Sequence, residues 1–306
     1  MNEQLVSIAV VTYNSSRTVI ETLESVKAQT YSAIELIVSD DHSTDNTLTI
    51  VREWFVENKD RFLNIKLLSS DENKGIAPNR NKCIREASGE WIKFVDGDDM
   101  LTPNSIESYL SVISDEVNFI MGNFIILNEK GEKKNFTIEQ DFFKLNASEQ
   151  LVLQNQKARI LWPGIISRKK AFLELNGLDE RFPMLDDFPF FVKALKAGYK
   201  FDSVAADVFI YRVHEESAQR SVKFHISHVN YVNQVIVPNY LKEKKYIDYW
   251  HDKLWSKREL AKIGNRPVKA FFIHLLMLIS DVKEWYYIVR NNIYSPIVFK
   301  WRALKK

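Results

Sequence analysis

The sequence predicts an α/β fold in which a mixed, mainly parallel sheet is flanked by helices and followed by a helical C-terminal extension. Three observations predict this fold. Short apolar, β-branched segments alternate with amphipathic helical segments along the first hundred residues, which is the pattern of parallel βαβ units. Polar or acidic residues follow several of these apolar segments. The 306 residues, 45% of them hydrophobic, suit one large domain with an appendage.

The first four strands are expected where short apolar segments occur, at residues 5–11, 34–38, 65–68 and 91–95. A first helix should run to about residue 28, and a second should place Val51 and Trp54 on its apolar side. A third helix is expected at 77–87, with Gly89 just beyond its end. The candidate N-cap residues of the first two helices are Ser15, Ser16, Ser43 and Thr44.

The next part of the chain predicts shorter elements. Thr102 and Pro103 favour a helix start, and that helix should run to about residue 113. The remaining expected elements are a hairpin of strands 117–127 and 133–138, a helix at 147–157, a strand-to-helix segment at 165–175, a helix at 186–196 and a strand at 208–213. We therefore expect a catalytic domain over 1–221, with halves 1–100 and 101–221, and a helical tail over 222–306.

Three carboxylates stand within four residues directly after the fourth strand: Asp96, Asp98 and Asp99. Like charges this close repel, and each raises the pKa of its neighbours. A divalent cation such as Mg²⁺ or Mn²⁺ would relieve the repulsion, because these ions prefer oxygen ligands and leave positions for substrate phosphates. The alternative is a solvated acidic turn.

The other expected strands also end in polar clusters. The carboxyl ends of parallel strands meet at one edge of a sheet, where ligands bind in such folds. Three clusters at the same edge disfavour the acidic-turn alternative; they lie at residues 12–14, 40–41 and 96–99. The sequence therefore predicts a metal–diphosphate site at this edge.

Ordered motifs along residues 5–221 resemble those of family 2 glycosyltransferases. The motifs are found at residues 6–14, 25–31, 34–45, 73–75, 80–81, 87–90, 96–99, 162–165, 176–182, 186–187 and 211–221. The resemblance implies a Rossmann-like GT-A fold and an inverting enzyme of bacterial polysaccharide biosynthesis that uses a nucleotide sugar. It covers no recognised motif beyond Ser221.

The resemblance implies a binding site for the nucleotide-sugar donor. In it, Asp41 accepts a hydrogen bond from the uracil ring N–H; negative charge at a helix start is its alternative role. UDP and dTDP present the same ring N–H, so both donors remain open. Asp96 is implied to reach the ribose or the metal. The other donor-binding residues that the resemblance implies are Thr12, Tyr13, Asn14, Asn73 and Arg80. A solvated helix arginine is the alternative role of Arg80.

The resemblance also implies a metal site and a catalytic base. Asp98 is the implied ligand of Mn²⁺ or Mg²⁺, with Asp99 in support. His214 is implied to complete the metal shell or to contact the diphosphate, and a hydrogen-bonded structural histidine is its alternative role. Asp187 is the implied general base that deprotonates the acceptor hydroxyl, with Asp186 beside it.

Two departures from the family pattern concern this site. The family commonly has Gly where His42 stands, and Glu where Asp186 stands. The shorter carboxylate of Asp186 leaves its contact open. His42 either lines the donor pocket or points to solvent.

We thus expect a metal-dependent inverting hexosyl- or N-acetylhexosaminyltransferase that acts on a glycan or lipid-linked glycan. A nucleotidyltransferase of similar fold is one alternative, but its Gly-rich basic N-terminal loop is absent. A phosphatase would need its carboxylate motif after the first strand. A non-catalytic nucleotide-sugar or carbohydrate-binding protein is expected to lose Asp98 or Asp187. No nucleic-acid partner is expected.

The tail differs from the rest of the chain in charge. Residues 222–306 hold 16 Lys and Arg against 6 Asp and Glu, a net charge of +10, whereas residues 1–221 have a net charge of −8. Aromatic and aliphatic clusters accompany the basic residues, as in helices that lie on anionic membranes. The alternative is a tail that packs on the catalytic core or on a second subunit of a homodimer.

The sequence also predicts the compartment. The N-terminus lacks the basic region of a signal peptide, and a single cysteine, Cys83, suits a reducing environment. The longest apolar stretch, 270–279, is too short to span a bilayer, which needs ~20 apolar residues. A cytoplasmic protein, peripheral on the inner face of the cytoplasmic membrane, is expected.

Overall fold

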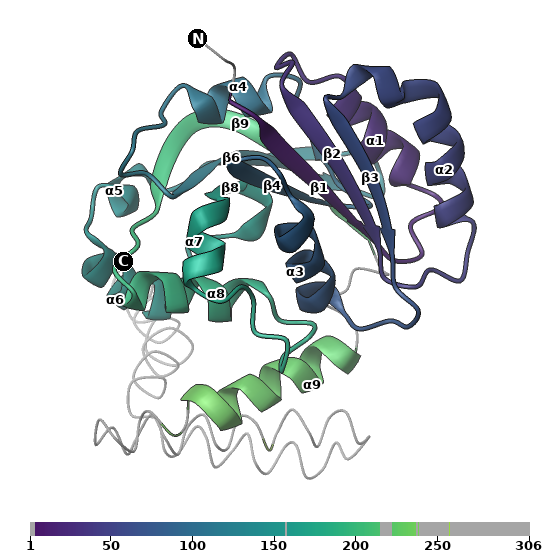
Figure 1. The fold of residues 1–306 in the computed structure, drawn as a ribbon. Coiled ribbons are helices and arrows are strands. Elements are labelled where there is room, and N and C mark those ends of the chain that lie inside the picture. Colours follow the sequence, from purple (N-terminus) through teal and green to yellow (C-terminus); the bar gives the residue numbers. More distant parts are fainter. Residues whose placement is uncertain (1–3, 157, 215–221, 237, 239–256, 258–306) are drawn as a thin grey trace, which may run out of the picture. The chain divides into compact units, whose positions relative to one another are not determined.

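The computed structural model describes residues 4–156, 158–214, 222–236, 238 and 257. The chain divides into two compact units, Met1–Ser217 and Ala218–Lys306. In the first unit, the described strands form one nine-stranded sheet, ordered β3-β2-β1-β4-β8-β6-β9-β5 with β7 paired to β6 (Figure 1). The strands are β1 (Val6–Thr12), β2 (Ile34–Asp40), β3 (Asn64–Ser69), β4 (Trp91–Asp96), β5 (Met100–Leu101), β6 (Phe119–Asn128), β7 (Lys133–Phe136), β8 (Ile165–Arg168) and β9 (Asp202–Val213).

The first four strands are parallel, as predicted. β1 pairs with β2 on one side and with β4 on the other, and β2 pairs with β3. Every residue of β1 and β2 is buried, because helices cover both faces of this part of the sheet. Figure 1 shows α3 and α7 on one face of the sheet and α1 on the other.

The other strands make the sheet mixed. β8 is antiparallel to both β4 and β6, while β6 is parallel to β9 with a register shift around Asn123. The hairpin predicted over 117–138 is confirmed as β6 and β7. β9 begins at Asp202 rather than at 208. The sequence did not predict its first residues because they are a mixture of polar and apolar residues and do not form an apolar run. The predicted mixed, mainly parallel α/β fold is confirmed.

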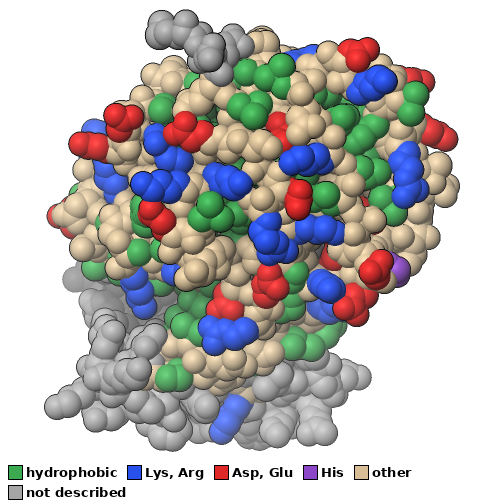
Figure 2. All heavy atoms as spheres, viewed as in Figure 1, with side chains coloured by type: hydrophobic (Ala, Val, Ile, Leu, Met, Phe, Trp, Pro, Cys, Tyr) green, Lys and Arg blue, Asp and Glu red, His purple; other side chains and the backbone are tan. Residues whose placement is uncertain are grey.

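Helices occur close to most of the expected positions. They are α1 (Val19–Lys27), α2 (Thr47–Asn58), α3 (Ile76–Glu86), α4 (Ser105–Leu110), α5 (Gln140–Phe143), α6 (Ala147–Gln156), α7 (Lys169–Glu174), α8 (Asp187–Lys196) and α9 (Val222–Tyr231). α4 ends three residues earlier than predicted, and β5 and α5 were not predicted. Over α3 and α7, basic and acidic side chains are interspersed (Figure 2), as on an ordinary solvent-facing surface.

The predicted N-caps were wrong for both of the first two helices. α1 begins at Val19, after a turn in which the Ser15 carbonyl accepts the N–H of Val19 at 2.9 Å. α2 begins at Thr47, whose N–H is accepted by Asp45 Oδ1 at 3.0 Å. The hydroxyl of Ser43 instead donates to Asp40 at 2.5 Å, so a tertiary contact takes the group that would have capped the helix.

An aromatic cluster positions α8 against the sheet. Phe94 stacks on Trp162 with ring centroids 5.6 Å apart, and Phe172 stacks on Phe190 at 4.9 Å. Trp162 also contacts Phe191 at 5.1 Å. These rings come from β4, α7, α8 and the turn before β8, so the start of α8 is fixed relative to the end of β4.

In the second unit the structure describes α9, followed by a π-helix over Val232–Ile236. The aromatic and aliphatic clusters that predicted a membrane-binding tail, at 270–279, 285–288 and 298–302, lie outside the described residues. Within the described part of the chain, no helix has both the length and the apolar character needed to cross a membrane.

Candidate active site

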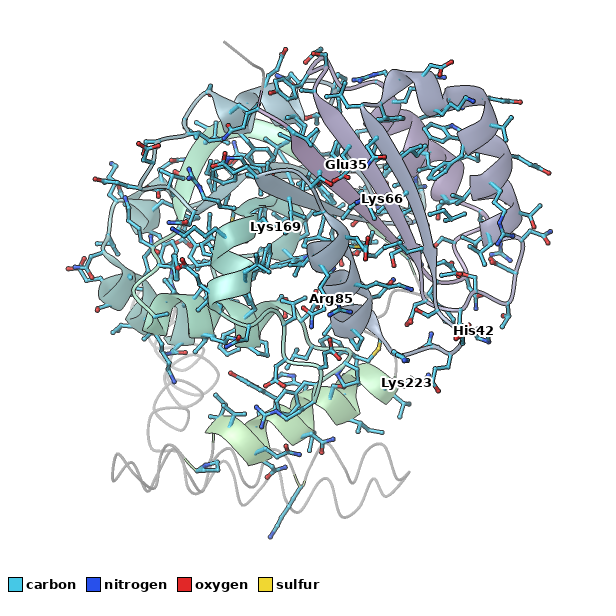
Figure 3. The ribbon with its side chains drawn as sticks, in the orientation of Figure 1. Glu35, His42, Lys66, Arg85, Lys169 and Lys223 are labelled. Carbon is cyan, nitrogen blue, oxygen red and sulfur yellow. The ribbon has the colours of Figure 1, made fainter. Side chains whose placement is uncertain are left out.

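The carboxyl ends of β1, β2 and β4 lie side by side, because β1 pairs in parallel with both neighbours. Thr12 is opposite Asp40, and Val11 is opposite Asp96. His42, which follows β2, marks this edge in Figure 3. The structure therefore brings together the three polar clusters that the sequence placed at strand ends, at 12–14, 40–41 and 96–99.

Two of these clusters are joined by hydrogen bonds between their loops. Asp40 is fully buried, and its carboxylate accepts the Thr12 hydroxyl at 2.8 Å and the Ser43 N–H at 2.8 Å. Asn14 has a left-handed φ of 50°, and its side-chain oxygen accepts the N–H of Thr44 at 2.8 Å. Between these anchored residues, the Tyr13 side chain is 48% exposed. The β1 and β2 loops thus form one unit that presents an accessible aromatic ring.

The backbone conformation of His42 accounts for one departure from the family pattern, in which glycine is common at this position. The φ of His42 is 64°, in the left-handed region that glycine adopts most readily. Histidine is among the residues that tolerate this conformation. The side chain is exposed, with Nδ1 3.3 Å from the carbonyl oxygen of Ser70.

Asp41 organises the loop that precedes α3. It is 4% exposed, and its two carboxylate oxygens accept the backbone N–H groups of Lys74 at 3.0 Å and Gly75 at 2.7 Å. Gly75 has a φ of 98°, and a Cβ there would lie 2.8 Å from the Pro183 carbonyl oxygen. Each carboxylate oxygen has a further lone pair, so Asp41 can still accept a bond from a ligand. Asn73 is half-buried at the start of the same loop.

The loop that carries the three carboxylates is held from several sides. Gly97 has no room for a side chain, since a Cβ would lie 2.7 Å from Ser15 Oγ. The hydroxyl of Thr18 donates to the Gly97 carbonyl at 2.8 Å. Asp99 is 2% exposed and accepts the backbone N–H of Arg212 at 2.7 Å. Asp99 is therefore an internal anchor of the loop.

Asp98, which is half-buried, contacts His214. His214 Nε2 lies 2.8 Å from Asp98 Oδ2. Burial and the charge of Asp96 raise the pKa of Asp98, and the contact with His214 opposes that shift. Burial, with the charges of Asp98 and Asp96, raises the pKa of Asp99 well above its usual range. Among the described residues, no group of three or more His, Cys, Asp or Glu side chains is arranged to hold a metal ion by itself.

Arg80 lies beneath the carboxylates rather than on an open surface. Its side chain is 3% exposed and pairs with Asp96 at 2.5 Å and with Asp186. The guanidinium also lies over the Trp162 ring, 4.8 Å from its centroid. Burial lowers the pKa of Arg80, but the charges of Asp186 and Asp96 outweigh it and raise the pKa. Arg80 therefore joins the end of β4 to the start of α8, and a bond to a phosphate would need its guanidinium to become accessible.

The two acidic residues at the start of α8 have different neighbours. Asp186 is bound to Arg80. Asp187 instead accepts the N–H of Phe188 at 2.6 Å. Burial, together with the charge of Asp186, raises the pKa of Asp187 to about 6. A carboxylate with this pKa is ionised at neutral pH and is a stronger base than an ordinary aspartate.

Two residues at the site received no role from the sequence. Arg212 donates its backbone N–H to Asp99 and, through Nε, a bond of 2.8 Å to the Asp98 carbonyl. Burial, together with the charges of Asp99, Asp96 and Asp98, raises the pKa of Tyr211 to about 12. The position of Arg212, two residues before His214 at the end of β9, could have drawn attention to it.

The sequence and fold also resemble those of known proteins. The sequence model of "Glycosyl transferase family 2" matches residues 7–175. WfgD of Escherichia coli, named a UDP-Glc:alpha-D-GlcNAc-diphosphoundecaprenol beta-1,3-glucosyltransferase, is 37% identical over 141 residues, which cover 46% of this chain and 53% of WfgD. The chain thus spans about half the length of this relative.

Two solved structures share the fold. S. aureus TarS 1-349 in complex with UDP-GlcNAc superimposes with a TM-score of 0.60 at 17% identity, covering 88% of this chain and 90% of that chain. GalNAc-T7 with UDP, GalNAc and Mn²⁺ gives 0.56 at 16% identity, covering 76% and 48%. These likenesses show the GT-A architecture. Because the family model matches more than half of the chain, the protein belongs to glycosyl transferase family 2.

Proposed function

We propose that this protein is an inverting glycosyltransferase that moves a sugar from a nucleotide diphosphate, most simply a UDP-sugar, to a hydroxyl of a lipid-linked glycan. The observation that carries the proposal is the convergence of Asp41, the carboxylates of residues 96–99 and Asp187 at one end of the sheet. The name of WfgD, which specifies a UDP-glucose donor and a diphosphoundecaprenol-linked acceptor, supports these substrate classes.

The donor would bind across the ends of β1, β2 and β4. The buried carboxylate of Asp41 accepts the ring N–H of the base, while the exposed ring of Tyr13 stacks on it. Asn14 holds the loop beneath the nucleotide, and Asn73 flanks the base. Asp96, whose side chain is 40% exposed, reaches the ribose. Arg80 acts by holding Asp96 in place.

Asp98 and His214 fit a divalent cation such as Mn²⁺. These two residues would hold the ion, because Asp98 Oδ2 and His214 Nε2 lie only 2.8 Å apart. Such ions need few protein ligands when substrate phosphates supply the others. When bound, the metal would stabilise the negative charge of the departing diphosphate.

Asp187 would act as the general base. It takes the proton of the acceptor hydroxyl, whose oxygen forms a bond to the anomeric carbon as the bond to the phosphate oxygen breaks. The leaving nucleotide diphosphate takes the bonding electron pair, and attack from the opposite side inverts the configuration. Asp186 suits this role less well, because Arg80 neutralises it.

The proposal is tested by incubating the full chain with Mn²⁺, a panel of UDP-sugars and a lipid-diphosphate-linked N-acetylhexosamine, and measuring UDP release and glycan extension. We expect acceptor-dependent release with one donor. Asp187→Asn should keep donor binding but lower turnover ~10²-fold or more. Glu149→Gln, an exposed change at the start of α6, is the control. Normal turnover of Asp187→Asn, or no acceptor-dependent release with any donor, would contradict the proposal.

A further inference from the structure

We propose that Arg212 is a positioning residue that holds Asp98 and His214 ready for the metal. This inference rests on the proposed metal site and adds a determinant of its affinity. The Arg212 side chain crosses the carboxylate loop: Nε donates to the Asp98 carbonyl at 2.8 Å, and Nη2 pairs with Glu21 of α1 at 2.5 Å. The side chain therefore spans from β9 over the loop to α1.

Arg212 lies in β9, and His214 directly follows Val213, the last residue of that strand. Arg212 and the imidazole that would bind the metal therefore have a common support in β9. β9 further pairs with β5, where Met100 is opposite Ile210, directly after the carboxylate loop. Any movement of the loop relative to β9 would change the distance between Asp98 and His214.

The loop needs an external restraint because its carboxylates repel one another. The backbone N–H of Arg212 fixes Asp99 from one side, and Thr18 fixes Gly97 from the other. The residue between these anchors is Asp98, and the bond from Arg212 Nε to its carbonyl fixes its backbone. Because the guanidinium charge is already paired with Glu21, we infer that Arg212 acts on the loop rather than on a phosphate.

The test measures Mn²⁺ binding to the full chain by isothermal titration calorimetry and by the loss of free Mn²⁺ signal in electron paramagnetic resonance. Arg212→Met keeps most of the side-chain length and the backbone bond to Asp99. We expect it to weaken Mn²⁺ binding about tenfold, as loss of a residue that orients a metal ligand does. Arg212→Lys should not restore affinity, since one ammonium cannot reproduce the planar, forked contact.

Arg168→Met is the matched control. Arg168 also pairs with a carboxylate, Glu90 at 3.0 Å, and donates to a carbonyl, that of Ser114, at 3.0 Å. It lies beside Trp91, at the opposite end of β4 from the carboxylate loop. Thermal denaturation of both variants separates general destabilisation from a local effect, and the control should bind Mn²⁺ like the wild type.

Asp98→Asn separates this inference from the proposed function. If Asp98→Asn binds Mn²⁺ normally, the proposed metal site is wrong. If Asp98→Asn loses Mn²⁺ while Arg212→Met binds it as the wild type does, only the positioning role is overturned. A loss of UDP affinity in Arg212→Met with EDTA present would likewise overturn it, since Arg212 would then contact the nucleotide directly.

Discussion

Asp186 and Asp187 are adjacent in the chain but differ in their neighbours. Arg80 pairs with Asp186, whereas Asp187 has a backbone N–H and the negative charge of Asp186 nearby. The burial of Asp187 therefore acts without a cation in direct contact, and its pKa rises to about 6. The pairing of Arg80 with only one of the two carboxylates thus neutralises Asp186 and leaves Asp187 as the stronger base.

This difference predicts the pH dependence of the enzyme. A general base works only when deprotonated, so kcat/KM should fall about tenfold per pH unit below about pH 6. Glycosyl transfer measured from pH 4.5 to 8 at saturating Mn²⁺ checks this. An acid limb centred near pH 4, as for an ordinary aspartate, would contradict the assignment.

The same pKa predicts a gain in stability when the carboxylate is removed. A folded-state pKa raised from 3.8 to about 6 means that the ionised form is disfavoured in the folded protein. This cost is absent below the unfolded pKa and is complete above about pH 6. Asp187→Asn should therefore raise the free energy of unfolding by about 1–3 kcal/mol at pH 8. Urea titrations at pH 8 and pH 4 check this; an equal effect at both values would exclude the charge as its cause.

At the scale of elements, the segment after α3 has a contact that a helical pattern does not reveal. The C-terminus of α3 is followed by Gly89, which the sequence indicated as a helix-ending residue. The structure gives another reason for this glycine: a Cβ would lie 2.6 Å from the Ser7 nitrogen and 2.8 Å from the Leu5 carbonyl oxygen. The glycine thus permits close approach to β1 rather than an unusual backbone angle.

Gly89→Ala should consequently destabilise the first unit by about 2 kcal/mol or more, because the atoms in its way are backbone atoms of a central strand. Gly131→Ala is the comparison. Gly131 has a φ of 77° but nothing within 4 Å of a Cβ, so only the conformational cost of about 1 kcal/mol applies there. Chemical denaturation of both variants measures the difference, and a larger loss for Gly131→Ala would contradict this explanation.

The sequence predicted those elements whose pattern is long enough to be recognised. The strands β1 to β4 are apolar or end in polar clusters, so both their positions and their common edge followed from the chain. β5 and α5 have two and four residues, too few for any periodicity. The predicted cap of the second helix was wrong because the Ser43 hydroxyl bonds to Asp40, a contact that depends on the packing of the loop.

The arrangement of the candidate site followed from the sequence to a similar extent. Parallel strands must bring residues 12–14, 40–41 and 96–99 together, whereas α8 joins them only through Arg80 and the aromatic cluster. The contact between Arg212 and Glu21 joins residues 191 positions apart, which no local pattern encodes. The buried position of Arg80 likewise depends on Trp162, contributed by the turn before β8.

At the scale of the whole molecule, the uneven distribution of charge predicts where the enzyme works. Residues 222–306 have a net charge of +10 and residues 1–221 a net charge of −8. An acceptor linked to a membrane lipid would be reached most easily by an enzyme held at an anionic surface. Each Lys or Arg near such a surface contributes about 1 kcal/mol, and the contribution is screened by salt.

We therefore expect the full chain to co-sediment with vesicles that contain anionic phospholipid, and much less with neutral vesicles. Binding should decrease steeply as salt rises from 50 to 500 mM, because the attraction is electrostatic. Replacing Lys300, Arg302, Lys305 and Lys306 by Gln should weaken it, while four Gln replacements at Lys59, Lys130, Lys133 and Lys134 of the first unit serve as the charge-matched control. Equal binding to both vesicle types, or an equal loss in both quadruple variants, would show that the tail serves another role. In that case, analytical ultracentrifugation of the same variants would test whether the tail joins two copies of the chain.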